Sequence, residues 1–108
     1  MTVGIYKIEN LINHKCYIGQ SVHIERRWQE HCQPTAKSAI GLAIKKYGKD
    51  NFSFEILEKC LTTQLDEKEI YYITFFNSLK PNGYNILFTP DYYHTHSNIK
   101  TKADAELI

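Results

Sequence analysis

The chain has 108 residues, with 13 Lys and Arg against 12 Asp and Glu, so its formal net charge is +1. A hydrophobic content of 43% with 13% aromatic residues excludes a wholly disordered chain, and this length predicts one domain. No apolar run approaches the roughly 20 residues of a membrane-spanning helix, and no signal-peptide pattern is present. The three cysteines are widely spaced without a CxxC pair, which argues against disulfides and zinc and favours a cytoplasmic location.

Charge is distributed unevenly along the chain. Residues 1–49 carry eight Lys and Arg and three Asp and Glu, a net charge of +5, whereas residues 50–108 carry five and nine, a net charge of −4. A basic N-terminal half is compatible with binding a polyanion, but a charge of this size is also ordinary for a solvated surface. Charge alone therefore assigns no function.

The N-terminal residues predict a β-hairpin. Residues 3–8 and 16–20 are rich in β-branched and aromatic residues and are joined by a short polar stretch. A register in which paired residue numbers sum to 23 would place Tyr6 opposite Tyr17 and their neighbouring glycines opposite each other. One face of the hairpin would then be a bare backbone patch flanked by two phenols. Tyrosine pairs are common in hairpins, so this pair alone also fits ordinary packing.

A helix is predicted over residues 22–32, with Ser21 as its N-cap. His23, Arg27 and His31 follow one another at i, i+4 and i+8 and form a polar stripe along it. Such a stripe is by default a solvent-exposed face, although its arginine and histidines are also residue types that bind phosphate.

The remaining elements follow from apolar periodicity. Residues 40–47 predict a second helix that ends at Gly48, residues 52–60 a third strand, and residues 64–77 a third helix with Asp66 at a capping position. The element order is therefore ββααβα. This order predicts an α+β fold, in which a small and largely antiparallel sheet packs against helices.

Glu69 lies where the third predicted helix should be apolar. It follows Leu65 by four residues and precedes Ile73 by four, so it falls inside the stripe that faces the core. Glutamate is almost never fully buried unless it is paired or bound to something. Glu69 is therefore either a functional carboxylate or a rim residue paired with a basic side chain such as Arg27.

Five short motifs occur in a fixed order. Gly4-Ile5-Tyr6 and, after ten intervening residues, Tyr17-Ile18-Gly19 come first. They precede an arginine at Arg27, a glutamate at Glu69 and the closing tripeptide Gly83-Tyr84-Asn85. In this order and spacing the chain resembles the GIY-YIG nuclease superfamily, and within it the intron-encoded and free-standing phage homing endonucleases. The fold of that family, a three-stranded antiparallel sheet flanked by helices, agrees with the predicted element order.

The resemblance covers residues 1–88 and implies a catalytic domain there. Residues 89–108 are interpreted as a polar tail or linker, or as the start of a further DNA-binding region. The resemblance implies metal-dependent hydrolysis of DNA phosphodiester bonds by an intracellular phage or bacterial enzyme. The alternatives are a restriction or repair nuclease of the same superfamily, a non-catalytic DNA-binding module, and a small metabolite-binding regulatory domain. Glu69 argues against the binding module, because an acid on that surface would repel a polyanion.

The resemblance also implies roles for single residues. Glu69 would hold one divalent ion, Mg²⁺ or Mn²⁺, and Arg27 would contact a phosphate oxygen. Tyr17 would activate or orient the attacking water with support from Tyr6, although the two could exchange roles, and Arg27 or the metal would have to lower the phenol pKa. His31 would donate to a phosphate or relay a proton.

Other residues are expected to bind DNA or to organise the site. Gly4 and Gly19 would leave room for close backbone approach, and Asn85 would order the site or the scissile strand. No small-molecule cofactor beyond the metal is expected, and no membrane. The lysines expected to line a phosphate track are Lys7, Lys15, Lys45, Lys46 and Lys49.

Overall fold

The structure, a computed structural model, describes residues 2–86. It confirms the predicted order ββααβα and adds two short 3₁₀ turns, η1 and η2. The predictions for the tail over residues 89–108 lie outside the described residues. The elements are β1 (Gly4–Asn10), β2 (Cys16–Ser21), α1 (Ile24–His31), α2 (Ala39–Tyr47), η1 (Lys49–Asn51), β3 (Phe52–Lys59), η2 (Thr62–Gln64) and α3 (Leu65–Phe76).

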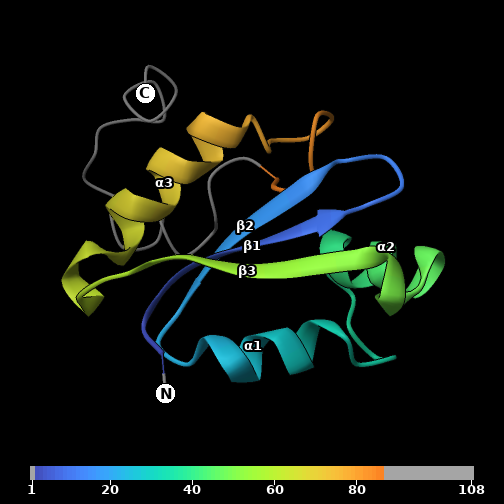
Figure 1. Cartoon of the computed structure of the whole chain (residues 1–108), viewed down its shortest axis with the longest axis horizontal. Coiled ribbons are helices and arrows are strands. Elements are labelled where there is room, and N and C mark those ends of the chain that lie inside the picture. Colours follow the sequence, from blue (N-terminus) through green and yellow to red (C-terminus); the bar gives the residue numbers. More distant parts are fainter. Residues whose placement is uncertain (1, 87–108) are drawn as a thin grey trace.

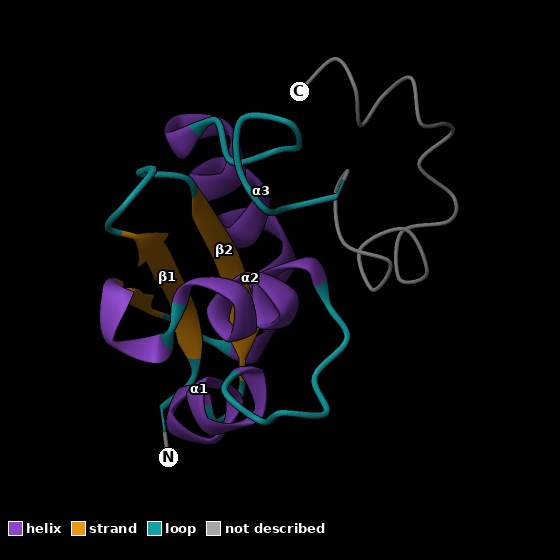
Figure 2. Ribbon diagram, turned by 90° about the vertical axis from the view of Figure 1, so that its right-hand side faces the viewer, coloured by secondary structure: helices purple, strands orange, loops and turns teal. Residues whose placement is uncertain are grey.

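The three strands form one antiparallel sheet in the order β2-β1-β3, with β1 in the centre. Helix α3 lies on one face of the sheet, and α1 lies on the other (Figure 1). Turned by 90°, the molecule shows α2 beside α1 (Figure 2). The predicted α+β architecture is confirmed. No helix within residues 2–86 is long and apolar enough to cross a membrane.

Each face of the sheet has its own apolar core. Strand side chains alternate between the two faces, so neighbours in β1 contribute to different cores. One core joins β1 and β2 to α3 and contains Ile5, Ile18, Leu65, Ile70 and Ile73. The other joins β1 and β3 to α1 and α2 and contains Tyr6, Ile8, Ile24, Ile40, Ala43, Ile44 and Phe52.

The predicted hairpin register is wrong by two residues. Tyr6 pairs with Gly19, and Ile8 pairs with Tyr17, so paired numbers sum to 25. The connection between the strands, residues 11–15, is shorter than the predicted one over residues 9–15, because β1 continues to Asn10. Asn10 stabilises this turn: its Oδ1 accepts from the Ile12 N–H at 2.8 Å, and its carbonyl oxygen accepts from the His14 N–H at 2.7 Å. A shift of two keeps every side chain on its face, so both tyrosines still point the same way.

Helix α1 begins two residues later than predicted, and its N-cap is His23 in place of Ser21. Ser21 ends β2, and its Oγ accepts from the His23 N–H at 2.8 Å. The His23 ring nitrogen Nδ1 in turn accepts from the Arg26 N–H at 3.3 Å. Two polar side chains therefore share the turn between β2 and α1, and the second of them does the capping.

The ends of the other helices follow local conformation. Gly48 ends α2 with a φ of 93°, which confirms the predicted stop, since a residue without Cβ adopts this region most readily. Before α3, the Leu61 N–H donates to Gln64 Oε1 at 3.0 Å, so the polar cap lies in η2 and not at Asp66 as predicted. Helix α3 ends at Asn77 in the left-handed conformation, with a φ of 51°.

Candidate active site

Tyr6 and Tyr17 lie on one face of the hairpin with ring centroids 6.2 Å apart. Gly19, opposite Tyr6, makes room for both rings, because a Cβ there would overlap the Tyr6 hydroxyl and lie 2.9 Å from Tyr17 Cε2. A Cβ on Gly4 would overlap the Glu58 carbonyl of β3. The expectation that these glycines leave a bare patch is therefore wrong, since the protein itself fills the space at both.

His31 is buried against the tyrosines. The Tyr6 hydroxyl and His31 Nε2 are 2.8 Å apart in a hydrogen bond, and the Tyr17 ring meets the imidazole edge-on at 5.4 Å. His31 is 3% exposed, so the default interpretation of a solvated stripe is wrong for this residue. Burial, with the nearby positive charge of Arg27, lowers the His31 pKa from 6.5 to about 4. The imidazole is therefore neutral at neutral pH.

The lowered pKa of His31 predicts a pH-dependent stability. Between pH 6.5 and about 4 the unfolded chain binds a proton at His31 that the folded chain does not, so the free energy of unfolding falls as pH falls through this window. The full difference corresponds to about 3 kcal/mol. Urea unfolding of wild type and His31→Gln at pH 7 and pH 4 measures it, because glutamine keeps a hydrogen-bonding group beside Tyr6 but does not titrate. If the free energy of unfolding fell by the same amount from pH 7 to pH 4 in both proteins, the prediction would be wrong.

The two phenols are held in their protonated form. Burial is the main cause that raises the pKa of Tyr6, followed by the negative charge that Tyr17 would carry. Burial also raises the pKa of Tyr17, and the charge of Glu69 raises it further. Arg27 acts in the opposite direction on both, as expected, but it does not overcome burial. In the protein without a cation, both tyrosines are hydrogen-bonding groups and not phenolates.

Arg27 lies on α1 beside the two phenols. Its Nη1 donates to Glu30 Oε1 at 2.6 Å, one turn along the helix, and its side chain is 40% exposed. Burial alone would lower the Arg27 pKa, but the Glu30 carboxylate and the adjacent phenols raise it. The guanidinium is thus a fixed positive charge, oriented by Glu30 and open to solvent on one side.

Glu69 is buried at the opposite side of β2. It is 1% exposed, which excludes the rim position that the helical pattern allowed. Gln20 Nε2 donates to Glu69 Oε1 and to Asp66 Oδ1, each at 2.9 Å. Because Glu69 raises the pKa of both Tyr6 and Tyr17, its charge acts on the phenols across the edge strand. A carboxylate, a guanidinium, two phenols and an imidazole thus surround β2.

Gln20 and Asp66 are the members of this group that the sequence interpretation missed. Gln20 follows Ile18 by two residues and therefore lies on the same face of β2, the face that packs against the core. A polar side chain on that face could have indicated a functional contact. Asp66 precedes Glu69 by three residues on the same helical face, but its place in the first turn also has the ordinary explanation of the helix dipole. The amide of Gln20 contacts both acids, and this contact becomes visible in the tertiary structure.

The oxygen ligands at this site fit a single hard divalent cation. Within residues 2–86 no three side chains among His, Cys, Asp and Glu lie close enough together to hold a metal ion. Mg²⁺ is commonly bound by one or two carboxylates, with water and substrate phosphates completing its octahedron. The buried carboxylate of Glu69 meets that requirement, with Asp66 close by.

Asn85 organises β2 from outside the sheet. Its Oδ1 accepts from the Ile18 N–H and its Nδ2 donates to the Ile18 carbonyl, both at 2.9 Å. The Ser78 hydroxyl donates to the same Oδ1 at 2.6 Å, and the Tyr84 N–H donates to the Cys16 carbonyl at 2.9 Å. Asn85 therefore pairs with the free edge of β2 as a neighbouring strand would, at the residue between Tyr17 and Gly19.

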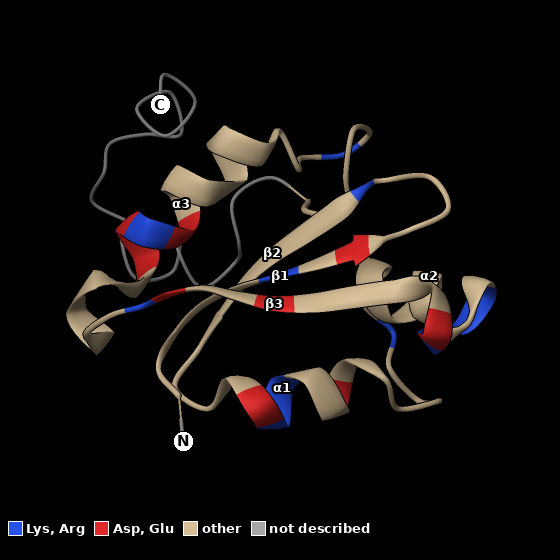
Figure 3. Ribbon diagram, in the orientation of Figure 1, with Lys and Arg blue, Asp and Glu red and all other residues tan. Residues whose placement is uncertain are grey.

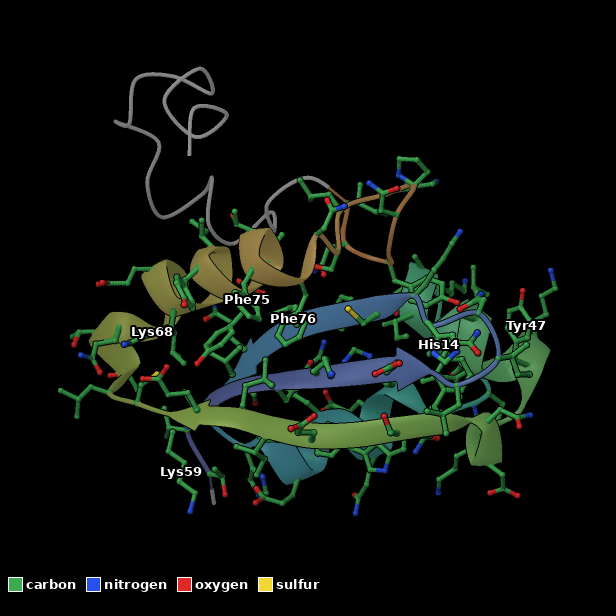
Figure 4. The ribbon with its side chains drawn as sticks, turned by 45° about the horizontal axis from the view of Figure 1, so that its top comes forward. His14, Tyr47, Lys59, Lys68, Phe75 and Phe76 are labelled. Carbon is green, nitrogen blue, oxygen red and sulfur yellow. The ribbon has the colours of Figure 1, made fainter. Side chains whose placement is uncertain are left out.

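The lysines divide into two groups. Lys7 lies on the α3 side of the sheet, 15% exposed, with Nζ 3.4 Å from Glu9 and 3.6 Å from Glu55. Its Nζ also lies 4.7 Å from the ring centre of Phe76, labelled in Figure 4. The prediction that Lys7 lines a phosphate track is wrong, because these contacts hold it away from the tyrosine face. The other four lysines of the predicted track, Lys15, Lys45, Lys46 and Lys49, are exposed.

Basic and acidic residues are interspersed in the view of Figure 3. Acidic residues occupy the start of α3 and part of α1, beside basic ones. The lysines at the end of α2 are exposed, and the phosphate track stays a prediction.

This fold and this site define a nuclease catalytic domain. The chain belongs to the GIY-YIG catalytic domain family, which matches residues 2–85. Intron-associated endonuclease 1 of Enterobacteria phage T4 is 38% identical over 93 residues, which cover 80% of this chain and 37% of the phage protein. The chain thus spans well under half the length of that relative.

Two solved structures share the fold closely. The catalytic domain of homing endonuclease I-TevI superimposes with a TM-score of 0.67 at 34% identity, covering 78% of this chain and 97% of that one. A glutamate-to-alanine mutant of the catalytic domain of intron endonuclease I-TevI gives a TM-score of 0.67 at 32% identity, covering 82% and 97%. Both the predicted fold and the predicted nuclease class are confirmed.

Proposed function

We propose that the chain hydrolyses phosphodiester bonds in DNA with one divalent cation, Mg²⁺ or Mn²⁺, as the catalytic domain of a homing-type endonuclease. The observation that carries this proposal is the buried carboxylate of Glu69, which is 1% exposed. Its charge raises the pKa of Tyr6 and of Tyr17, and the guanidinium of Arg27 lies on the other side of β2. The relatives named as intron or homing endonucleases support the homing type over a restriction or repair nuclease.

In the proposed reaction a water oxygen bonds to phosphorus and gives up a proton to solvent, while the bond from phosphorus to the 3′ oxygen breaks. The departing 3′ oxygen takes up a proton from solvent, so that one water molecule is added in total. Glu69 would hold the cation, which when bound lowers the pKa of water and neutralises charge on the phosphate. Arg27 donates to a non-bridging phosphate oxygen from its solvent-facing side, where its planar fork suits two oxygens.

The two tyrosines differ in burial, and we assign them different roles for this reason. Tyr6 is fully buried and Tyr17 is half-buried, so Tyr17 is the phenol that a water can reach. Tyr17 orients this water by hydrogen bonding. Tyr6 and His31 share a hydrogen bond whose direction depends on the imidazole tautomer, so this pair can pass a proton away from Tyr17. The greater exposure of Tyr17 supports its proposed water-facing role, with Tyr6 in the supporting one.

The proposal also says which part of the chain carries the catalytic activity. Residues 1–88 form the catalytic domain, and selection of a DNA sequence depends on parts of the protein outside them. The exposed lysines at Lys15, Lys45, Lys46 and Lys49 contact the DNA backbone without reading its sequence.

Nicking of supercoiled plasmid tests the proposal. The 108-residue chain with Mg²⁺ is expected to convert supercoiled plasmid to nicked and linear forms. EDTA should abolish this conversion, and excess Mg²⁺ should restore it. If a gel shift shows bound DNA while neither Mg²⁺ nor Mn²⁺ supports cleavage, the chain is a DNA-binding module and the catalytic proposal is wrong.

A further inference from the structure

Gln20 connects the two acids of α3 to the edge strand. It lies on the α3 side of β2, two residues after the buried Ile18, and it is half-buried. Its side-chain nitrogen Nε2 donates hydrogen bonds to Asp66 Oδ1 and to Glu69 Oε1, at 2.9 Å each. An amide nitrogen carries two N–H groups, so both are used, one for each carboxylate.

This arrangement fixes the orientation of the Glu69 carboxylate. The two N–H bonds of an amide diverge by about 120°, so the two acceptor oxygens are held about 5 Å apart. Asp66 and Glu69 are three residues apart on the same helix, and neither can move without straining the amide. The Gln20 amide therefore holds Oε1 of Glu69 in place, which limits the directions from which a cation can approach this carboxylate.

We propose that Gln20 is a positioning residue for Glu69: its amide ties the Glu69 carboxylate to Asp66 and thereby sets how strongly the site binds a divalent cation. The proposal rests on the proposed function only in that Glu69 is the cation ligand. Carboxylates that ligate metals are themselves commonly hydrogen-bonded, and loss of such an outer partner typically weakens metal binding 10- to 100-fold. Asp66 acts as the anchor of the amide and not as a ligand.

Mn²⁺ binding to the full 108-residue chain tests the proposal, with free Mn²⁺ measured by electron paramagnetic resonance. Gln20→Met keeps the length of the side chain but has no N–H, and it is expected to weaken Mn²⁺ binding about 10- to 100-fold. Gln29→Met makes the same change at an exposed position of α1 and is expected to bind Mn²⁺ as wild type does. Circular dichroism melts show that all variants are folded.

Two variants of Asp66 separate an anchor from a ligand. Asp66→Asn keeps an Oδ1 that can accept from Gln20, whereas Asp66→Ala removes the acceptor. Binding by Asp66→Asn should therefore stay within about threefold of wild type, while Asp66→Ala should bind as weakly as Gln20→Met. If both Asp66 variants lost Mn²⁺ affinity equally and strongly, Asp66 would be a metal ligand, and its proposed role as only an acceptor for Gln20 would be wrong.

Nicking kinetics distinguish a positioning role of Gln20 from a purely structural one, because only a positioning role changes the Mg²⁺ dependence of the rate. For Gln20→Met, saturating Mg²⁺ should restore kcat to within about threefold of wild type, while the Mg²⁺ concentration for half-maximal rate rises about 10- to 100-fold. Gln20→Met with wild-type Mn²⁺ affinity would overturn this inference alone. Wild type that binds no Mn²⁺ would overturn both the inference and the metal dependence of the proposed function.

Discussion

Glu69→Gln is expected to reduce the rate of plasmid nicking about 1000-fold, the scale seen when one group that stabilises transition-state charge is lost. Glutamine has the same shape as glutamate and keeps Oε1 as the acceptor for Gln20, so the hydrogen bond at 2.9 Å survives. What disappears is the negative charge of a buried side chain. The loss of activity would therefore report the charge and not the packing.

Initial nicking rates at saturating Mg²⁺ measure this effect, together with the thermal midpoint of each protein. The matched control is Glu67→Gln, which makes the same change on an exposed face of α3 two residues away and should keep the wild-type rate within about twofold. A Glu69→Gln protein that is folded and nicks within tenfold of wild type would show that this carboxylate is not central to the reaction.

Asn85→Ala is expected to destabilise the domain by about 3–4 kcal/mol, since each buried polar group left without a partner costs about 1–3 kcal/mol. Three groups lose the Asn85 side chain: the N–H and carbonyl of Ile18 and the hydroxyl of Ser78. All are buried, so water cannot easily replace it. The Ile18 peptide would also be less firmly held between Tyr17 and Gly19, so nicking should fall as well.

Thermal unfolding checks this expectation, with a fall in the midpoint of about 15–20 °C for a domain of this size. Asn82→Ala, in the exposed turn just before, is the control and should change the midpoint by less than about 3 °C. If Asn85→Ala unfolds within a few degrees of wild type, the amide does not anchor the edge of β2.

The local pattern of the sequence predicts the elements well because each depends on near neighbours. Alternation of apolar residues marks the strands, and the spacing at i, i+3 and i+4 marks the helices. Gly48 ends α2 as predicted, because its φ of 93° is a local property that favours glycine. The N-terminus of α1 was missed since Ser21 and His23 both bear capping groups, and the path of the chain after β2 decides between them.

The hairpin register was missed for a different reason. The spacing of the two strand segments allows both the predicted register, in which paired numbers sum to 23, and the observed one, in which they sum to 25. The bonds from Asn10 to the loop, with His14 in the left-handed conformation at a φ of 64°, select the observed register. Because the side-chain period of a strand is two, this error changed which residues are opposite each other but not which face they occupy.

The sequence by itself determined the kinds of element, their order, the family, and the place of one acid inside an apolar helical stripe. All of these are properties of residues within a few positions of one another, or of motifs in a fixed order. Tertiary structure alone decided the burial of His31 against Tyr6, the bridge from Gln20 to Asp66 and Glu69, and the pairing of Asn85 with Ile18. Each of these contacts joins residues at least 25 positions apart, and burial decides the energy of each.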